Sequence, residues 1–307
     1  MKRIQKHAFE SVCSVLFAGF FLGLAYGDIY DEFNDFCIQK FGAEKEPLAY
    51  QKFGNTLIMT GDGSWKHVSV TSACIAWETN LPAKTHVEYG ADASYGSIAC
   101  RDSSRFFYIH VHYVTGLSEG TTYHYRLVST DERGNTIVSG DSTFTTQTYA
   151  GKIRIPKDVP TGGSRFTLIE SGVTYIVTQD MVRDSLAFDI QAKNITLDLD
   201  GHMVVYDDVH QGEITGPDGN FWDYINQSSF GIRVGNNCSG FKILNGTIKQ
   251  GAGNDAAHQT SIGFSPVYVR GGVTGGEIAG ITAEYGGPQV SGLYFHTAPN
   301  NNVHHNV

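Results

Sequence analysis

Short runs of alternating apolar and polar residues, each ended by Gly or Asn, recur through the chain from Leu186 to Val307. Matching apolar positions at Ile232, Val267 and Leu293 are separated by 35 and 26 residues. A second series repeats with separations of 35 and 25 residues, at Ile243, Ile278 and Val303. Self-similarity of this kind, with very short strands and no amphipathic helix between them, predicts a solenoid of stacked coils.

The repeats resemble the right-handed parallel β-helix of the pectate-lyase-like superfamily, in phrases such as Gly231-Ile-Arg-Val-Gly235 and Pro266-Val-Tyr-Val-Arg-Gly271. The resemblance covers roughly the C-terminal half of the chain and implies a fold, whereas activity depends on the side chains that project from the coils. The sequence stops inside a repeat, at Asn302-Val-His-His-Asn-Val307, although solenoids are normally closed by a cap. We therefore expect residues 164–307 to be a β-helix truncated at its C-terminal end, and catalytic residues beyond position 307 remain an alternative.

Between Trp65 and Thr146 the pattern changes to short alternating strands separated by turn residues, which is typical of an antiparallel β-sandwich. The predicted strands are Val68–Thr79, Thr85–Tyr89, Phe106–Thr115, Thr122–Thr130 and Ser142–Thr146. The predicted fold class is therefore all-β, with an antiparallel sandwich followed by a parallel β-helix.

The sandwich residues resemble a fibronectin type III module, as found before the catalytic domain of purple acid phosphatases. The resemblance lies in Cys74-Ile-Ala-Trp77, in Pro82–Gly90 and in Leu117 followed by Tyr123, which fits a tyrosine corner. Ile75 and Trp77 are expected to point into the core. Phosphatase activity is not expected, because no spaced Asp, Asn and His metal-ligand motifs follow. The resemblance implies a spacer or docking module.

The N-terminus carries Lys2, Arg3 and Lys6, then the apolar run Val15–Ala25 and a small-x-small pattern ending at Gly27. This order predicts a secretory signal peptide, with an uncleaved anchor as the alternative. The predicted segments are 1–27 signal peptide, 28–60 lead-in, 61–147 sandwich, 148–163 linker and 164–307 β-helix. We expect a secreted or cell-surface monomer with no membrane span in the mature chain.

The net charge bears on which macromolecules this protein can bind, and the cysteines bear on disulfides and zinc sites. The net charge of −9 becomes about −11 once residues 1–27 are removed, and an acidic surface argues against a nucleic-acid partner. Export permits disulfides, and the remaining cysteines allow three connectivities that the sequence does not separate: Cys37, Cys74, Cys100 and Cys238. The sequence contains no CxxC spacing, so a structural zinc site is not expected.

Two insertions interrupt the repeats, residues 207–229 and 250–265, and both are rich in carboxylate and aromatic side chains. Long loops that leave a tight coil are expected to line a substrate groove. Trp222 and Tyr224 are candidate substrate-binding residues. Asp207, Asp208 and Asp223 are weak candidates for holding Ca²⁺ through hard oxygen ligands, although acidic loops are more often only solvated.

The repeat alignment predicts a second candidate surface. If the matched apolar residues point inward, then Arg233, Tyr268 and Tyr294 form one outward row, and Arg270 and His296 belong to the next row. Such a patch suits an anionic sugar. In β-elimination, Arg270 would neutralise a uronate carboxylate while His296 or Tyr294 acts as acid or base. The alternative is an ordinary exposed sheet face.

Other polar residues receive structural interpretations. Asp198 and Asp200, two residues apart, are expected to stabilise a turn, and Lys242 and Glu277 to form an ion pair between coils. His304 and His305 are expected to point apart, because neighbouring residues alternate along a strand. The sequence thus favours action on an extracellular polysaccharide, as a lyase or glycoside hydrolase. The alternative is a non-catalytic carbohydrate-binding or adhesive protein.

Overall fold

The computed structural model describes residues 35–40, 42, 50, 52–100, 104–160, 165–209, 230–251, 265–284 and 292–307. The chain divides into two compact units, Met1–Gly54 and Asn55–Val307. The predicted signal peptide lies outside the described residues, as does much of the lead-in, of which residues 35–40 are helical. No described helix is long and apolar enough to cross a membrane.

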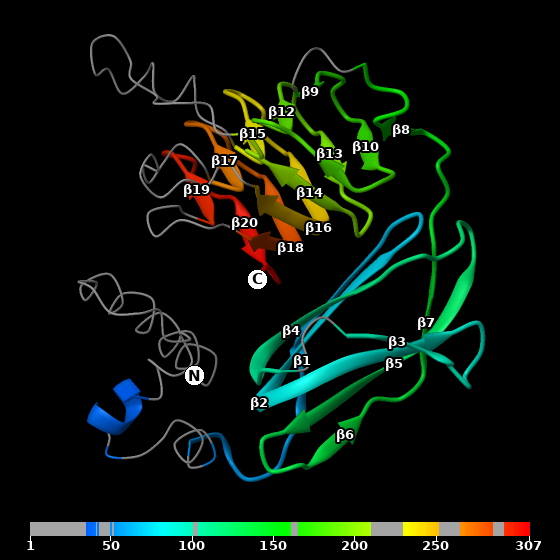
Figure 1. Ribbon diagram of the computed structural model, residues 1–307, viewed down its shortest axis with the longest axis vertical. Helices are drawn as coiled ribbons and strands as arrows, with labels where there is room; N and C mark the ends of the chain where they lie inside the picture. Colours follow the sequence, from blue (N-terminus) through cyan, green and yellow to red (C-terminus); the bar gives the residue numbers. More distant parts are fainter. Residues whose placement is uncertain are drawn as a thin grey trace. The chain divides into compact units, whose positions relative to one another are not determined.

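The first half of the larger unit is one antiparallel sheet of seven strands (Figure 1). Its strands are β1 (Met59–Val68), β2 (Ala73–Gly90), β3 (Ser97–Ala99), β4 (Phe107–Val114), β5 (Thr122–Asp131), β6 (Thr136–Val138) and β7 (Ser142–Thr145). Strand β2 lies at the centre, because it pairs with β1, β3, β4 and β5. We refer to this sheet, residues 59–145, as the sandwich, after the fold that the sequence predicts; its division into two packed layers stays a prediction.

The two strands predicted at Val68–Thr79 and Thr85–Tyr89 are a single strand, β2, and that prediction is corrected. The backbone stays extended through Pro82, and the register against β4 shifts between Glu78 and Ala83. The first part of β2 pairs with β1 and β4, and the second with β3 and β5. A proline in a strand often marks such an irregularity, where a ladder hydrogen bond is already missing.

The sandwich core contains the residues that the alternation predicts. Ile75 and Trp77 are buried, and the Trp77 indole N–H donates to the Ser129 hydroxyl at 3.0 Å. The Tyr123 hydroxyl accepts a hydrogen bond from the Ser118 backbone N–H at 3.0 Å. This contact has the form of the predicted tyrosine corner, in which a hydroxyl returns to the backbone upstream.

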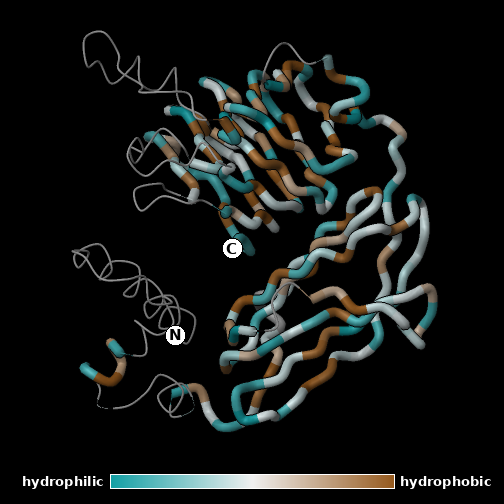
Figure 2. The backbone as a smooth tube through the Cα atoms, in the orientation of Figure 1, coloured by the Kyte–Doolittle hydropathy of each residue, from teal (hydrophilic) through white to brown (hydrophobic). Residues whose placement is uncertain are grey.

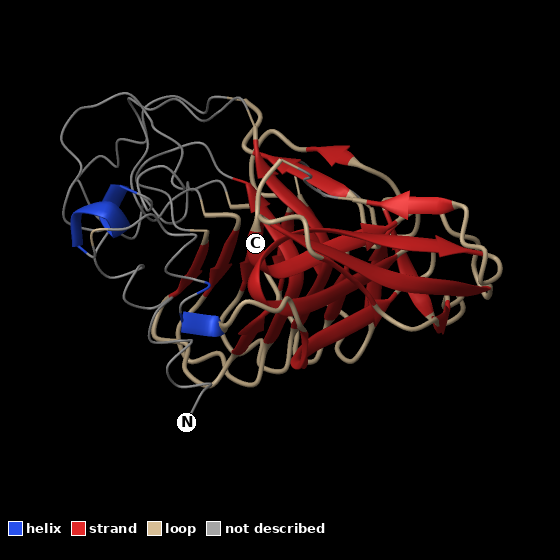
Figure 3. Ribbon diagram, turned by 90° about the horizontal axis from the view of Figure 1, so that it is seen from below, coloured by secondary structure: helices blue, strands red, loops and turns tan. Residues whose placement is uncertain are grey.

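The second half of the larger unit is a parallel β-helix. Its strands are β8 (Lys152–Ile155), β9 (Phe166–Leu168), β10 (Thr174–Val177), β11 (Met181–Val182), β12 (Phe188–Ile190), β13 (Thr196–Asp198), β14 (Met203–Tyr206), β15 (Ile232–Val234), β16 (Lys242–Gln250), β17 (Val267–Val269), β18 (Glu277–Glu284), β19 (Leu293–Phe295) and β20 (Asn302–His304). They form two parallel sheets, one with strands β9, β12, β15, β17 and β19 and the other with the rest. Figure 3 shows how strands dominate the described fold.

The register confirms the predicted repeats. Ile232 pairs with Val267, which pairs with Leu293, and the second series pairs in the same way. These positions, apart from Val303, lie in or against the buried core of the coils. Figure 2 shows apolar and polar residues along the coil strands. Because side chains alternate between the two faces of a strand, the apolar set supplies the buried core.

The predicted linker, residues 148–163, is corrected by the position of β8. Lys152–Ile155 pairs in parallel with β10, so this segment supplies the first strand of the β-helix. A linker between separate domains is expected where few contacts cross, but side chains of the sandwich form hydrogen bonds with the coils. The Tyr113 hydroxyl on β4 lies 2.8 Å from the Gly280 carbonyl and 3.0 Å from the Thr282 hydroxyl on β18.

Candidate functional site

Three connections of the β-helix run from a strand of the eight-stranded sheet to a strand of the five-stranded sheet. One connection runs from β14 to β15, a second from β16 to β17 and a third from β18 to β19. Each therefore enters the five-stranded sheet at the start of one of its strands. Trp222, Tyr224 and Asp223, predicted in the first insertion, lie outside the described residues. The described part of the candidate site is the outward face of β12, β15, β17 and β19, called here the arginine face.

The arginine face contains the predicted row of side chains. Arg233 on β15 pairs in register with Tyr268 on β17, and Tyr268 with Tyr294 on β19. Their neighbours in sequence belong to the buried coil core, so these three project to the opposite side. Arg270 and His296 follow two positions later on adjacent coils, which places their backbones about 4.8 Å apart.

The structure adds Asp189 to this row, a residue that the sequence interpretation missed. Asp189 on β12 pairs in register with Arg233, and its carboxylate accepts from the guanidinium Nε at 2.9 Å and Nη2 at 2.5 Å. The Gln191 amide also donates to it at 2.8 Å. Extending the repeat one coil toward the N-terminus, from Ile232 to Phe188, would have revealed this acidic partner.

The aromatic side chains of the face stack on one another. Ring centroids lie 4.6 Å apart for Phe230 and Tyr268, and 5.6 Å apart for Tyr268 and Tyr294. Tyr268 is buried, and burial raises the pKa of its hydroxyl, an effect that a hydrogen bond from Arg270 opposes. Tyr268 therefore stays a neutral phenol that supports Arg270, and its ring faces are occupied by other rings.

The two arginines of the face differ in electrostatic state. Arg233 is neutralised by the buried Asp189 carboxylate, so it is held in place by the fold. Arg270 is partly exposed, and no carboxylate of the described residues forms an ion pair with it. Of these two arginines, Arg270 is therefore the one whose positive charge is not neutralised by a carboxylate of the described residues.

The calcium candidates that the structure describes are Asp207 and Asp208. Asp207 is buried after β14, and its carboxylate accepts from the Gln250 amide at 2.8 Å. Among the described residues, no group of three or more His, Cys, Asp or Glu side chains is arranged to hold a metal ion. The described side chains thus supply no complete set of ligands, and the Ca²⁺ site stays a prediction.

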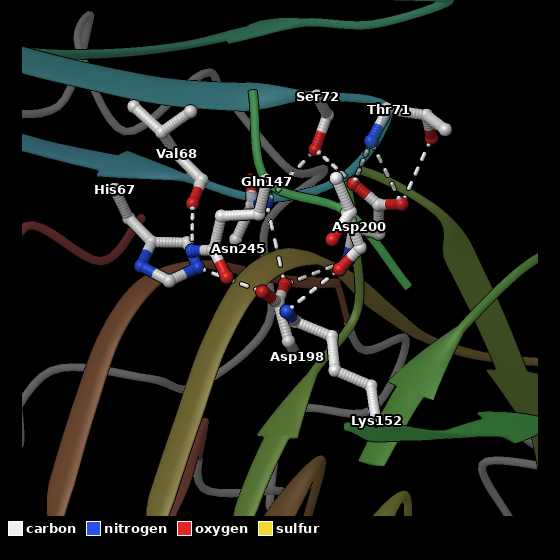
Figure 4. Close-up of polar contacts among 10 residues, drawn as sticks. His67, Val68, Thr71, Ser72, Gln147, Lys152, Asp198, Asp200 and Asn245 are labelled. Atoms are coloured by element: carbon white, nitrogen blue, oxygen red, sulfur yellow. Dashed lines mark hydrogen bonds and ion pairs between the residues drawn. The ribbon is translucent and has the colours of Figure 1, made fainter. Parts of the chain in front are cut away.

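Asp198 ends β13, a strand of the other sheet of the coils, and both Asp198 and Asp200 contact residues of the sandwich (Figure 4). The Asp198 carboxylate accepts from the Asp200 backbone N–H at 2.9 Å, and Asp200 has a φ of 47°, so the predicted turn-stabilising role is confirmed for Asp198. The Asp200 carboxylate instead accepts from Thr71 and Ser72. Both carboxylates are buried and bonded to sandwich residues. A substrate has no access to them while the sandwich is in this position.

Two further predictions concern residues on or next to strands of the eight-stranded sheet. Lys242 and Glu277 form the predicted ion pair, with Nζ and Oε2 2.5 Å apart. His304 and His305 do not point apart, because their Nδ1 atoms lie 2.7 Å from each other. His305 follows the end of β20 and has a φ of 53°, so strand alternation no longer applies to it.

The chain matches no protein-family model and no curated protein. Among solved structures it is similar to a family 28 exopolygalacturonase from Yersinia enterocolitica, with 12% identity, a TM-score of 0.31, and coverage of 78% of this chain and 60% of that chain. It is also similar to the pectate lyase PelI from Erwinia chrysanthemi, with 12% identity, a TM-score of 0.25, and coverage of 81% and 78%. The corresponding values for the pectate lyase Pel3 from Pectobacterium carotovorum are 9%, 0.22, 74% and 69%. The chain thus spans less than two thirds of the exopolygalacturonase.

Proposed function

We propose that this protein acts on a negatively charged extracellular polysaccharide, which binds along the arginine face. The observation that carries the proposal is the contrast between Arg233, paired with Asp189, and Arg270, which has no carboxylate partner among the described residues. A guanidinium is suited to a planar carboxylate, because it donates two parallel hydrogen bonds. The sugar ligand would supply to Arg270 the carboxylate that Asp189 supplies to Arg233.

The reaction that fits these side chains is β-elimination of a uronate. Arg270 binds the sugar carboxylate and stabilises the negative charge that develops when the proton on C5 leaves. His296 or Tyr294 accepts that proton, the C4–O bond breaks, and the electron pair forms a C4–C5 double bond. The leaving oxygen takes a proton from the other of these two groups. Tyr268 is excluded as the base, because it is buried and its pKa is raised.

A glycoside hydrolase has less support on this face. Hydrolysis needs two carboxyl groups about 5 to 9.5 Å apart on either side of the bond that is cleaved. Within the described part of the arginine face the carboxylate is Asp189, which is buried and paired with Arg233. The second candidate function is a non-catalytic carbohydrate-binding or adhesive protein, for which Tyr294 and Arg270 would be sufficient.

The other parts of the proposal concern the setting of this face. We propose that residues 1–27 direct export, that the protein is a secreted or cell-surface monomer, and that the coils wind in the right-handed sense. We propose that the sandwich is a fibronectin type III-like module, supported by the buried Trp77 and the Tyr123 contact. Because Tyr113 and Asp200 join it to the coils, its role is that of a docked module.

The test is an absorbance assay for unsaturated uronate products. The protein, expressed from its complete gene, is incubated with pectate, alginate or a glycosaminoglycan, with and without Ca²⁺. Arg270→Gln and His296→Gln are compared with Lys249→Gln, which removes a cation from the other sheet, where Lys249 pairs with Glu284 at 3.3 Å. We expect product with the unaltered protein and Lys249→Gln, and a loss of about 100-fold or more in the other two variants.

A measurement of binding separates the two candidate functions. Retention on an immobilised polyuronate that requires Arg270, without any unsaturated product, would support the binding protein and refute the lyase. Product formation that is equal in Arg270→Gln and Lys249→Gln would refute the arginine face as the site.

A further inference from the structure

Arg165 is a second cation beside the Asp189 carboxylate. It directly precedes β9, and its Nε lies 3.8 Å from Oδ2 of Asp189. Arg233 already donates to both oxygens of this carboxylate at hydrogen-bond distance, whereas 3.8 Å is longer than a hydrogen bond. One carboxylate therefore lies beside two guanidinium groups, and the charge that it neutralises is that of Arg233.

The two guanidinium groups also differ in their exposure to water. The side chain of Arg165 is 44% exposed, and that of Arg233 is 15% exposed. Among the described residues, the Arg165 guanidinium has the long contact with Asp189 and forms no hydrogen bond. A guanidinium can donate two parallel hydrogen bonds to a carboxylate. The donors of Arg165 are therefore available to a carboxylate that comes from outside the protein.

Arg165 and Arg270 lie on the same side of the coils at different levels of the stack. Each follows or precedes a residue of the buried core, Val269 or Phe166, so both side chains project outward. The strand order β9, β12, β15, β17 places Arg165 three coils from Arg270 (Figure 1). Neighbouring strands are about 4.8 Å apart, so the two backbones are separated by about 14 Å along the stack. The contact of Arg165 with Asp189 on β12 brings its guanidinium closer, to about 10 Å.

The charge of this face is opposite to that of the whole chain. Its described part has three arginines and one carboxylate, so the formal charge is +2, whereas the net charge of the chain is −9. A local excess of positive charge on an acidic protein attracts a polyanion to that face. Arg233 with Asp189 is neutral as a pair, so the excess belongs to Arg165 and Arg270.

We propose that Arg165 binds a second carboxylate of the same polysaccharide, about two or three sugars away from the uronate that binds Arg270. A sugar unit extends a 1,4-linked chain by nearly the spacing of one coil, so the polysaccharide lies along the stack of coils. This subsite rests on the function proposed above and adds a minimum length to it. A disaccharide reaches Arg270 alone, and a chain of about four or more units reaches both arginines.

The test compares the binding of short and long oligouronates. Calorimetry gives the Kd of a disaccharide and of a hexasaccharide of galacturonate, and of the matching alginate oligomers, in a His296→Gln background that slows cleavage. Arg165→Gln should weaken binding of the hexasaccharide by about 3- to 10-fold and leave the disaccharide unchanged. Arg154→Gln is the matched control, because Arg154 is a partly exposed arginine of the other sheet that pairs with Asp158. It should change neither Kd.

The dependence on length separates a subsite from a structural role. Arg165→Lys, which keeps the charge, should recover part of the hexasaccharide affinity. An equal loss for both lengths in Arg165→Gln, or no loss for the hexasaccharide, would overturn the subsite while leaving the role of Arg270 intact. If the His296→Gln protein bound no oligouronate, or bound each as well after Arg270→Gln, the proposed function would fail and the subsite with it.

Discussion

The Arg233 guanidinium on β15 and the Asp189 carboxylate on β12 form a two-point ion pair, with N–O distances of 2.9 and 2.5 Å. The side chains are 15% and 1% exposed, so the pair is largely removed from water. A buried charge is stable only while its partner remains, because its desolvation is otherwise uncompensated. This pair therefore makes Arg233 a structural residue of the arginine face, and in the function that we propose it is Arg270 that binds the ligand.

Replacement of Asp189 tests this interpretation of the pair. Asp189→Asn should lower the free energy of unfolding by about 3 to 5 kcal/mol, because Arg233 would remain buried with no counter-ion. The double variant Asp189→Leu with Arg233→Met should recover most of this loss. Urea denaturation gives both values, and Asp158→Asn, which breaks the more exposed pair with Arg154, serves as the control. A double variant as unstable as Asp189→Asn would contradict the interpretation.

The repeat series show how much of this fold can be predicted from sequence. The apolar residues of a parallel β-helix must stack coil on coil, so spacing alone aligned Ile232 with Val267 and Leu293. The same alignment placed Arg233, Tyr268 and Tyr294 in one row. Register fixes which residues are neighbours, and therefore the row of the candidate site could be predicted.

The state of those side chains could not be predicted in the same way. Burial of Tyr268 depends on Phe230, which is not one of the matched repeat positions. The pairing of Arg233 depends on Asp189, which lies on a coil that the repeat series did not include. The contact between the sandwich and the coils joins residues far apart in sequence, for example Ser72 and Asp200. A local pattern contains the alternation within one element and has no information about which turn of a sandwich meets which coil.

The stability that the Lys242–Glu277 ion pair contributes to the coils should depend measurably on pH. Burial alone would raise the pKa of Glu277, but hydrogen bonds from Lys242 and His304 lower it below the ordinary value of 4.5. Its stabilising contribution is therefore present above about pH 4.5 and is lost as the pH falls through the lowered pKa. Lys242 is half exposed, so the contribution at neutral pH should stay below about 1 kcal/mol.

The measurement is the difference in unfolding free energy between the unaltered protein and Glu277→Gln, at neutral pH and at about pH 3. The difference should shrink in acid. The control is Glu284→Gln, which breaks the more exposed pair with Lys249 and should have a smaller effect at both pH values. A difference that grows in acid would show that the sign is wrong.

The Tyr123 hydroxyl should contribute to sandwich stability through a single hydrogen bond. Tyr123→Phe keeps the ring against Phe144 and removes the acceptor of the Ser118 N–H. A loss of about 1 kcal/mol is expected in urea denaturation. Tyr125→Phe is the matched control, because its hydroxyl lies at 3.5 Å from the exposed Lys66 amine. A larger loss in the control would contradict the predicted tyrosine corner.

Gly280 on β18 tests how closely the sandwich packs against the coils. A Cβ at this position would lie 2.8 Å from the Cys74 Sγ and 2.8 Å from a ring carbon of Trp65, both in the sandwich. Gly280 also has a φ of +62°, which adds backbone strain to any substitution. Gly272 has a φ of +77°, and a Cβ there would have nothing within 4 Å, so Gly272→Ala isolates the strain. Gly280→Ala should therefore be less stable than Gly272→Ala by about 1 to 3 kcal/mol, the usual effect of overpacking. Thermal or urea denaturation of the two variants measures this difference, and equal stabilities would mean that the sandwich does not press on β18 in solution.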